Sequence, residues 1–185
     1  NVAYKDDMIA FWSEDIHYTH LMVCNEDGRK GMTPGNNGGI ISSVQRIEVS
    51  TGKFETILHG TDHCDGIRVT PWGTVLASEE TRDGRAYEVM APLITTGHWI
   101  ADRDSGDIRS AVDSEEPSVR VVQHRNLPVI AWEGLTLLPS GVLYAGDELR
   151  PGAPLVDDAG AEDENPPGRV GHDPSRRPAR QGRAA

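Results

Sequence analysis

Aromatic residues, cysteines and long apolar segments are all scarce in this sequence of 185 residues. Aromatic residues make up 5% of it and hydrophobic residues 37%, whereas it holds 20 glycines and 12 prolines. No segment keeps a sustained 3.6-residue hydrophobic period, and none is long and apolar enough to cross a membrane. The two cysteines, Cys24 and Cys64, permit one disulfide at most. These absences argue against long helices, a membrane span and a disulfide framework.

Basic residues are outnumbered by acidic ones. The sequence has 18 Lys and Arg against 29 Asp and Glu, for a net charge of -11. A nucleic-acid partner would require a basic face, so this charge argues against one, while it is compatible with cation binding. The first residue is Asn rather than Met, and the chain shows no signal peptide. We therefore expect a fragment or a processed chain.

One segment of the sequence occurs twice. Residues 65–80 (DGIRVTPWGTVLASEE) align without a gap on residues 133–148 (EGLTLLPSGVLYAGDE). Each copy begins with an acid and a glycine, has Pro-x-Gly in its middle and ends with two acids. Apolar positions on both sides of a Pro-x-Gly turn predict a β-hairpin in each copy. A unit that recurs within one chain indicates a repeat architecture.

The acids of each copy lie at the open end of its predicted hairpin. Opposed residues on paired strands lie roughly 5 Å apart at Cβ, so the first acid of each copy should approach the last two. Carboxylates this close repel one another, and a bound Ca²⁺ or Mg²⁺ removes that cost. The alternative is that the acids are simply solvated at exposed hairpin ends. The six residues are Asp65, Glu79, Glu80, Glu133, Asp147 and Glu148.

The rest of the sequence also reads as short strands separated by turns, which predicts an all-β fold. The two copies start 68 residues apart, more than the about 40 to 50 residues of one propeller blade, so we expect a blade with an insertion. We predict a partial β-propeller of repeated hairpins over residues 1–150, with too few hairpins to close a ring. Residues 151–185 hold half of the prolines and no aromatic residue, and this composition predicts a disordered tail.

The first copy with its lead-in, DHCDGIRVTPWGTVLASEET, resembles the PhoX-type alkaline phosphatase family. Members of that family carry a Cys followed by a Gly, then Thr-Pro-Trp-Gly-Thr, then Glu-Glu-Thr. Here these are Cys64, Gly66, residues 70–74 and residues 79–81. Upstream, LMVCNED resembles the family's strand that ends in Asn and an acid. The resemblance covers roughly residues 18–150, and the TPWGT block is its most specific part.

The resemblance implies a β-propeller with a metal site at the blade ends, near the central axis. It implies an enzyme that hydrolyses phosphomonoesters with iron and calcium, in which Cys64 supplies a thiolate to iron. Adjacent strand residues face opposite sides, so the sequence leaves open whether Glu79 or Glu80 reaches the metal. Cys64, Glu79 and Glu80 are the catalytic candidates. The candidate metal ligands are Cys64, Glu79, Glu80, Glu133, Glu148, Asp65, Asp147 and Glu26.

The same resemblance implies small phosphoester substrates, a monomeric full-length protein, and a periplasmic or secreted location in a bacterium. Two other functions stay open: a non-catalytic propeller that binds calcium or a partner, and a calcium-dependent propeller lactonase or esterase without iron. Cys64 could instead be a small buried hydrophobe, as Cys24 is expected to be. Trp72 and Trp132 are expected to be packing residues.

Overall fold

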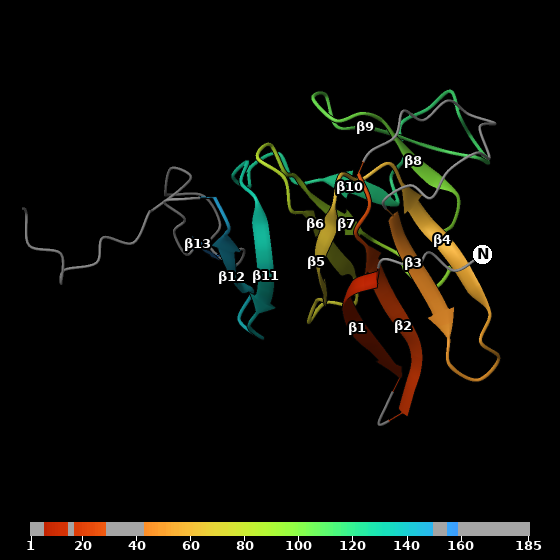
Figure 1. The fold of residues 1–185 in the computed structure, drawn as a ribbon. Coiled ribbons are helices and arrows are strands. Elements are labelled where there is room, and N and C mark those ends of the chain that lie inside the picture. Colours follow the sequence, from red (N-terminus) through yellow and green to blue (C-terminus); the bar gives the residue numbers. More distant parts are fainter. Residues whose placement is uncertain (1–5, 15–16, 29–42, 150–154, 159–185) are drawn as a thin grey trace, which may run out of the picture.

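The computed structural model describes residues 6–14, 17–28, 43–149 and 155–158 (Figure 1). Every regular element in these residues is a β-strand, which confirms the predicted all-β class. No helix in this part of the chain is long and apolar enough to span a membrane. The strands are β1 (Asp6–Glu14), β2 (His17–Asn25), β3 (Ser43–Glu48), β4 (Phe54–His59), β5 (Cys64–Val69), β6 (Val75–Glu79), β7 (Ala86–Val89), β8 (His98–Asp102), β9 (Asp107–Ser110), β10 (Val121–Gln123), β11 (Trp132–Leu137), β12 (Val142–Asp147) and β13 (Leu155–Asp158).

The strands form three sheets (Figure 1). The first sheet has the order β1-β2-β3-β4-β8-β9, in which β4 and β8 are parallel. The second has the order β10-β7-β6-β5 and the third the order β11-β12-β13, and both are antiparallel. In the sequence, β8 and β9 lie between β7 and β10 of the second sheet, but they pair at the edge of the first sheet instead. This inserted hairpin accounts for the long spacing between the two copies of the repeated segment.

Both copies of the repeated segment form the predicted hairpins, β5–β6 and β11–β12. In the first, the Thr70 N–H donates to the Thr74 carbonyl at 2.9 Å and closes the turn. Gly73 and Gly141 take φ values of 83° and 90°, a left-handed conformation that glycine adopts without steric cost. The Pro-x-Gly signal is therefore explained by the backbone of the turn.

The β1–β2 hairpin is a third copy of the same unit. In β5–β6 the register passes from Cys64–Glu79 to Ile67–Ala77, which leaves one extra residue on the first strand. The register of β11–β12 passes in the same way from Trp132–Asp147 to Leu135–Ala145, and that of β1–β2 from Asp6–Asn25 to Ile9–Val23. Such a bulge re-aims the side chains beside it. All three hairpins therefore share one pairing register and one bulge.

The hydrophobic core lies between successive sheets. In the first cluster, Met22 of the first sheet packs with Ile67 and Ala77 of the second, and all three are fully buried. In the second cluster, Leu76 of the second sheet packs with Leu135 of the third. The second sheet therefore uses one face toward the first sheet and the opposite face toward the third.

Two expectations change in the structure. Trp132 is fully buried as predicted, but Trp72 is 50% exposed, and its indole N–H donates to Glu88 Oε1 at 2.7 Å. Strand β13 pairs with β12 inside the segment predicted to be a disordered tail, because its backbone completes the edge of the third sheet. The fold thus extends to Asp158, and residues 159–185 lie outside the described residues. Within the described ranges the sheets form no closed ring.

Candidate cation site

Five acids of the three hairpins come together. Asp7, Asp65 and Glu133 lie at the bulges of β1, β5 and β11, while Glu80 and Glu148 directly follow β6 and β12. Carboxylate oxygens of Asp7, Asp65 and Glu80 lie within 4.8 Å of one another, and so do those of Glu80, Glu133 and Glu148. Glu80 belongs to both groups. We call these five residues the acidic cluster, and each sheet contributes to it.

Backbone contacts fix the position of Glu80. Its N–H donates to the His63 carbonyl at 2.7 Å, one residue before β5. Glu80 also forms an isolated antiparallel bridge with Ala131, and the Glu148 N–H donates to the Ala131 carbonyl at 3.0 Å. The ends of the second and third sheets are thereby joined beside the acidic cluster, so its carboxylates are held close by the backbone.

Mutual repulsion and burial perturb two of the carboxyl groups. Burial raises the pKa of Asp65 to about 6, and the charges of Asp7 and Glu133 add to the rise. Burial also raises the pKa of Glu80 to about 8, with Glu148, Glu133 and Asp65 adding to it. Both shifts mean that an additional negative charge is unfavourable here. A cation bound in the cluster would attract the carboxylates and favour their charged forms.

Asp65 gives a second and independent indication of a ligand. Its side chain is 3% exposed, and Oδ2 is buried without a hydrogen-bond partner among the described residues. A buried acceptor without a partner is costly, and native structures satisfy nearly all such atoms. Carboxylate oxygens of Asp7 and Glu80 lie within 4.8 Å of one of Asp65. A hard cation bound among these three acids would therefore give Asp65 a partner. The donor set of carboxylate oxygens is the one that Ca²⁺ prefers.

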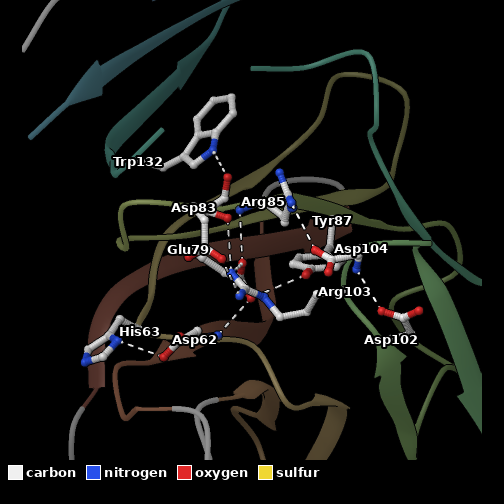
Figure 2. A network of polar contacts seen from close by, with 11 residues as sticks. Asp62, His63, Glu79, Asp83, Arg85, Tyr87, Asp102, Arg103, Asp104 and Trp132 are labelled. Carbon is white, nitrogen blue, oxygen red and sulfur yellow. Dashed lines mark hydrogen bonds and ion pairs between the residues drawn. The ribbon is translucent and has the colours of Figure 1, made fainter. Parts of the chain in front are cut away.

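Glu79 is not part of the acidic cluster. It points to the other side of β6, is fully buried and forms an ion pair with Arg103 at 2.6 Å (Figure 2). Burial raises the pKa of Glu79, and the Arg103 guanidinium opposes that rise. The adjacent residue Glu80 is therefore the one that reaches the cluster. Glu79 also accepts hydrogen bonds from the Asp62 N–H (2.8 Å), the Arg85 N–H (3.0 Å) and the Tyr87 hydroxyl (3.3 Å).

The partner of Glu79 comes from the inserted hairpin. Arg103 lies in the turn between β8 and β9 and also pairs with Asp83 at 3.0 Å (Figure 2). Asp83 lies between β6 and β7, and the carbonyl of the next residue, Gly84, accepts the Trp132 indole N–H at 3.3 Å. The insertion therefore supplies the cation that neutralises a buried carboxylate of the second sheet. In this structure Glu79 is a buried ion-pair partner outside the acidic cluster, and its role as a metal ligand or catalytic residue stays a prediction.

Cys64 also differs from the expectation. It forms a disulfide with Cys24, and both residues are fully buried between the first and second sheets. The metal ligand and nucleophile formed by cysteine is the thiolate, and a disulfide sulfur has no such charge. The predicted roles of Cys64 as iron ligand and catalytic residue are therefore inconsistent with this structure. The prediction failed because a pairing across 40 residues of sequence depends on how two sheets pack.

Two further candidates lie outside the acidic cluster, and one member was missed. Asp147 of the β11–β12 hairpin occupies the position that Glu79 has in β5–β6, and its Oδ1 accepts the Leu149 N–H at 3.2 Å. Glu26 belongs to neither carboxylate group among the described residues. Asp7 was not predicted because the β1–β2 hairpin is longer: paired residues Ile9 and Val23 are 14 positions apart, whereas the equivalent residues Ile67 and Ala77 of β5–β6 are 10 apart. An alignment that allowed a gap at the turn could have found it.

Comparison of the chain with protein-family models, with curated proteins and with solved structures finds no match.

Proposed function

We propose that the acidic cluster binds calcium and that the chain is part of a propeller-type, metal-dependent phosphomonoesterase. The observation that carries the cation site is the buried Oδ2 of Asp65, which has no hydrogen-bond partner among the described residues, in a group with the carboxylates of Asp7 and Glu80. Three repeated hairpins with their bulged strands side by side support a propeller arrangement. The reaction rests on the resemblance of the first repeated segment to PhoX-type phosphatases.

The carboxylates of the acidic cluster are the kind of ligand that calcium prefers. Ca²⁺ takes six to eight oxygen ligands in flexible geometry; each group of three acids, with Glu80 common to both, would supply part of such a set and water the rest. Asp7, Glu133 and Glu148 are exposed, so a substrate could reach the ions from solvent. Calcium at such a site would bind phosphate oxygens and neutralise their charge during hydrolysis. We do not extend the proposal to iron, because Cys64 is disulfide-bonded.

The calcium site can be tested without any assay of turnover. Isothermal titration of the full chain with CaCl₂ should show binding that Asp65→Asn weakens by at least about tenfold, the effect of about 1.4 kcal/mol. Asp147→Asn is the matched control, since it removes an acid at the end of β12 that belongs to neither carboxylate group. Absence of calcium binding, or equal weakening by both variants, would disprove the site.

The reaction is tested on the same calcium-loaded protein. We expect hydrolysis of an aryl phosphomonoester that is lost with EDTA and restored by CaCl₂. Because Cys64 is disulfide-bonded, the alternative of a calcium-dependent esterase or lactonase without iron stays open. An aryl ester and a lactone should therefore be assayed in parallel. Cleavage of these substrates alone would replace the phosphatase by the esterase alternative. Calcium binding without turnover of any of the three would leave a non-catalytic calcium-binding protein.

A further inference from the structure

The two junctions between neighbouring sheets have the same arrangement. We call the side of each hairpin that bears Ile67 or its register equivalents the front face, and the opposite side the back face. The front face of the second sheet packs on the back face of the first, where Met22 lies. The front face of the third sheet, with Leu135, packs on the back face of the second, where Leu76 lies. Each junction therefore joins one front face to one back face.

Among the described residues, no other sheet covers the front face of the first sheet at β1. Ile9 occupies the register position of Ile67, and Phe11 that of Val69. Ile9 is 44% exposed and Phe11 57%, whereas Ile67 is fully buried. The Phe11 ring lies 4.9 Å from that of Tyr18, which is 60% exposed. An apolar surface therefore stands where the other two hairpins make their junctions.

The third sheet has the complementary opening on its back face. Tyr144 occupies the register position of Leu76 in the second sheet and of Met22 in the first. Those two residues are 5% and 0% exposed, whereas Tyr144 is 42% exposed. Val156 is the partner of Tyr144 on β13 and is 47% exposed. The back face of the third sheet therefore exposes two apolar side chains, one on β12 and one on β13.

We propose that these two faces bind each other between two copies of this chain, in a head-to-tail arrangement. The occupant follows from the molecule itself, because a front face is covered by a back face at both junctions that the structure describes. Repeat proteins bury their faces through such nearest-neighbour interfaces. Since the two faces differ, the contact is heterologous, and it closes into a ring or continues as an open chain. The proposal departs from the monomer that the family resemblance implies.

Light scattering coupled to size exclusion, over a wide range of protein concentrations, tests the proposal on the full chain. The wild type should have a mass above that of one chain, and Phe11→Lys and Tyr144→Lys should each reduce it to one chain. Val112→Lys is the control, because Val112 is apolar, 95% exposed and on neither face. All three variants replace exposed side chains, so each should unfold in one cooperative transition, with a Tm equal to that of the wild type at protein concentrations low enough for the wild type to be monomeric.

A mixture of the Phe11→Lys and Tyr144→Lys variants gives the decisive result. One junction in a mixed pair joins two unaltered faces, so a species of two chains should reappear on mixing, which damage to the fold would not produce. A wild type that stays monomeric, association insensitive to both variants, or a mixture that stays monomeric would each overturn the proposal.

A measurement without variants keeps the test valid if a variant misfolds. Hydrogen exchange of the wild type should show protection in β1, β12 and β13 that rises with protein concentration. Equal exchange at all concentrations would contradict the proposal. Neither face includes a residue of the acidic cluster, so the calcium titration and this test can fail independently.

Discussion

Replacing Arg103 by Met should strongly destabilise the fold because it leaves a buried charge without its counter-ion. Arg103 Nη2 lies 2.6 Å from Glu79 Oε2, and the two side chains are 11% and 0% exposed. Removing one partner of a buried ion pair typically costs about 3 to 5 kcal/mol. Glu79 would retain three hydrogen-bond donors, so we expect the lower end of that range, about 3 kcal/mol. For a chain of this size that corresponds to a fall in Tm of about 6 to 12 °C.

A second substitution separates the effect of charge from that of packing. In the Arg103→Met background, Glu79→Gln removes the unpaired charge and should recover about 1 to 2 kcal/mol of the free energy of unfolding. The direction in which pH changes the stability of Arg103→Met also follows from the pKa of Glu79. Without Arg103 the pKa of Glu79 rises further, so the native state binds a proton that the unfolded state has lost at neutral pH. The deficit of Arg103→Met should therefore shrink as the pH is lowered toward the unfolded-state pKa of Glu79.

Urea unfolding at neutral and at mildly acidic pH measures both effects. Arg85→Met is the control, because the Arg85 guanidinium pairs with Asp104 at 3.4 Å and that carboxylate is 90% exposed; such a pair contributes about 0 to 1 kcal/mol. If Arg103→Met costs no more than the control, or if the double variant is less stable than Arg103→Met, the assignment of Glu79 as a buried structural carboxylate is wrong.

Two further predictions concern the buried carboxylate of Glu88 and the disulfide between Cys24 and Cys64. The pKa of Glu88 is lowered to about 2, first by the hydrogen bond to His124 and then, against burial, by those from Thr74 and Trp72; its contribution is present above the unfolded-state pKa and lost as the pH falls through the folded one. Glu88→Gln should therefore destabilise the chain at neutral pH and flatten the acid limb of its stability profile, and parallel urea-unfolding profiles would contradict this. The disulfide links residues 40 positions apart, so loop-closure entropy predicts that Cys24→Ala/Cys64→Ala loses about 4 kcal/mol. A loss below about 1 kcal/mol in the same urea assay would show that the cross-link does little for the unfolded chain.

The hairpins were predictable because their signals are local. Alternating apolar residues and Pro-x-Gly determine β5–β6 and β11–β12, and strand pairing then brings the first acid of each copy toward the last. Asp65, Glu80, Glu133 and Glu148 were named on that basis and do lie in the acidic cluster. The remaining features depend on contacts between distant segments. Nothing near Glu79 in the sequence indicates that Arg103, from an inserted hairpin, would neutralise it, and nothing near Cys64 indicates that Cys24 packs against it.

The three copies differ in a way that separates structural residues from site residues. The last paired position on the second strand of each hairpin is Asn25 in β1–β2, Glu79 in β5–β6 and Asp147 in β11–β12. The surroundings of this position differ from sheet to sheet. Glu79 pairs with Arg103, whereas Asp147 accepts a hydrogen bond from the N–H of Leu149, two residues further along the chain.

The next residue is a glutamate in every copy, and the bulge of the first strand carries an acid in every copy: Asp7, Asp65 and Glu133. A hairpin needs no carboxylate at either position for its register, because pairing there is made by the backbone. Repulsion between these acids opposes folding in the absence of a ligand. An acid at the bulge of all three hairpins, despite that cost, is the pattern that the proposed cation would account for, because these three acids all belong to the acidic cluster, whereas Glu26 does not.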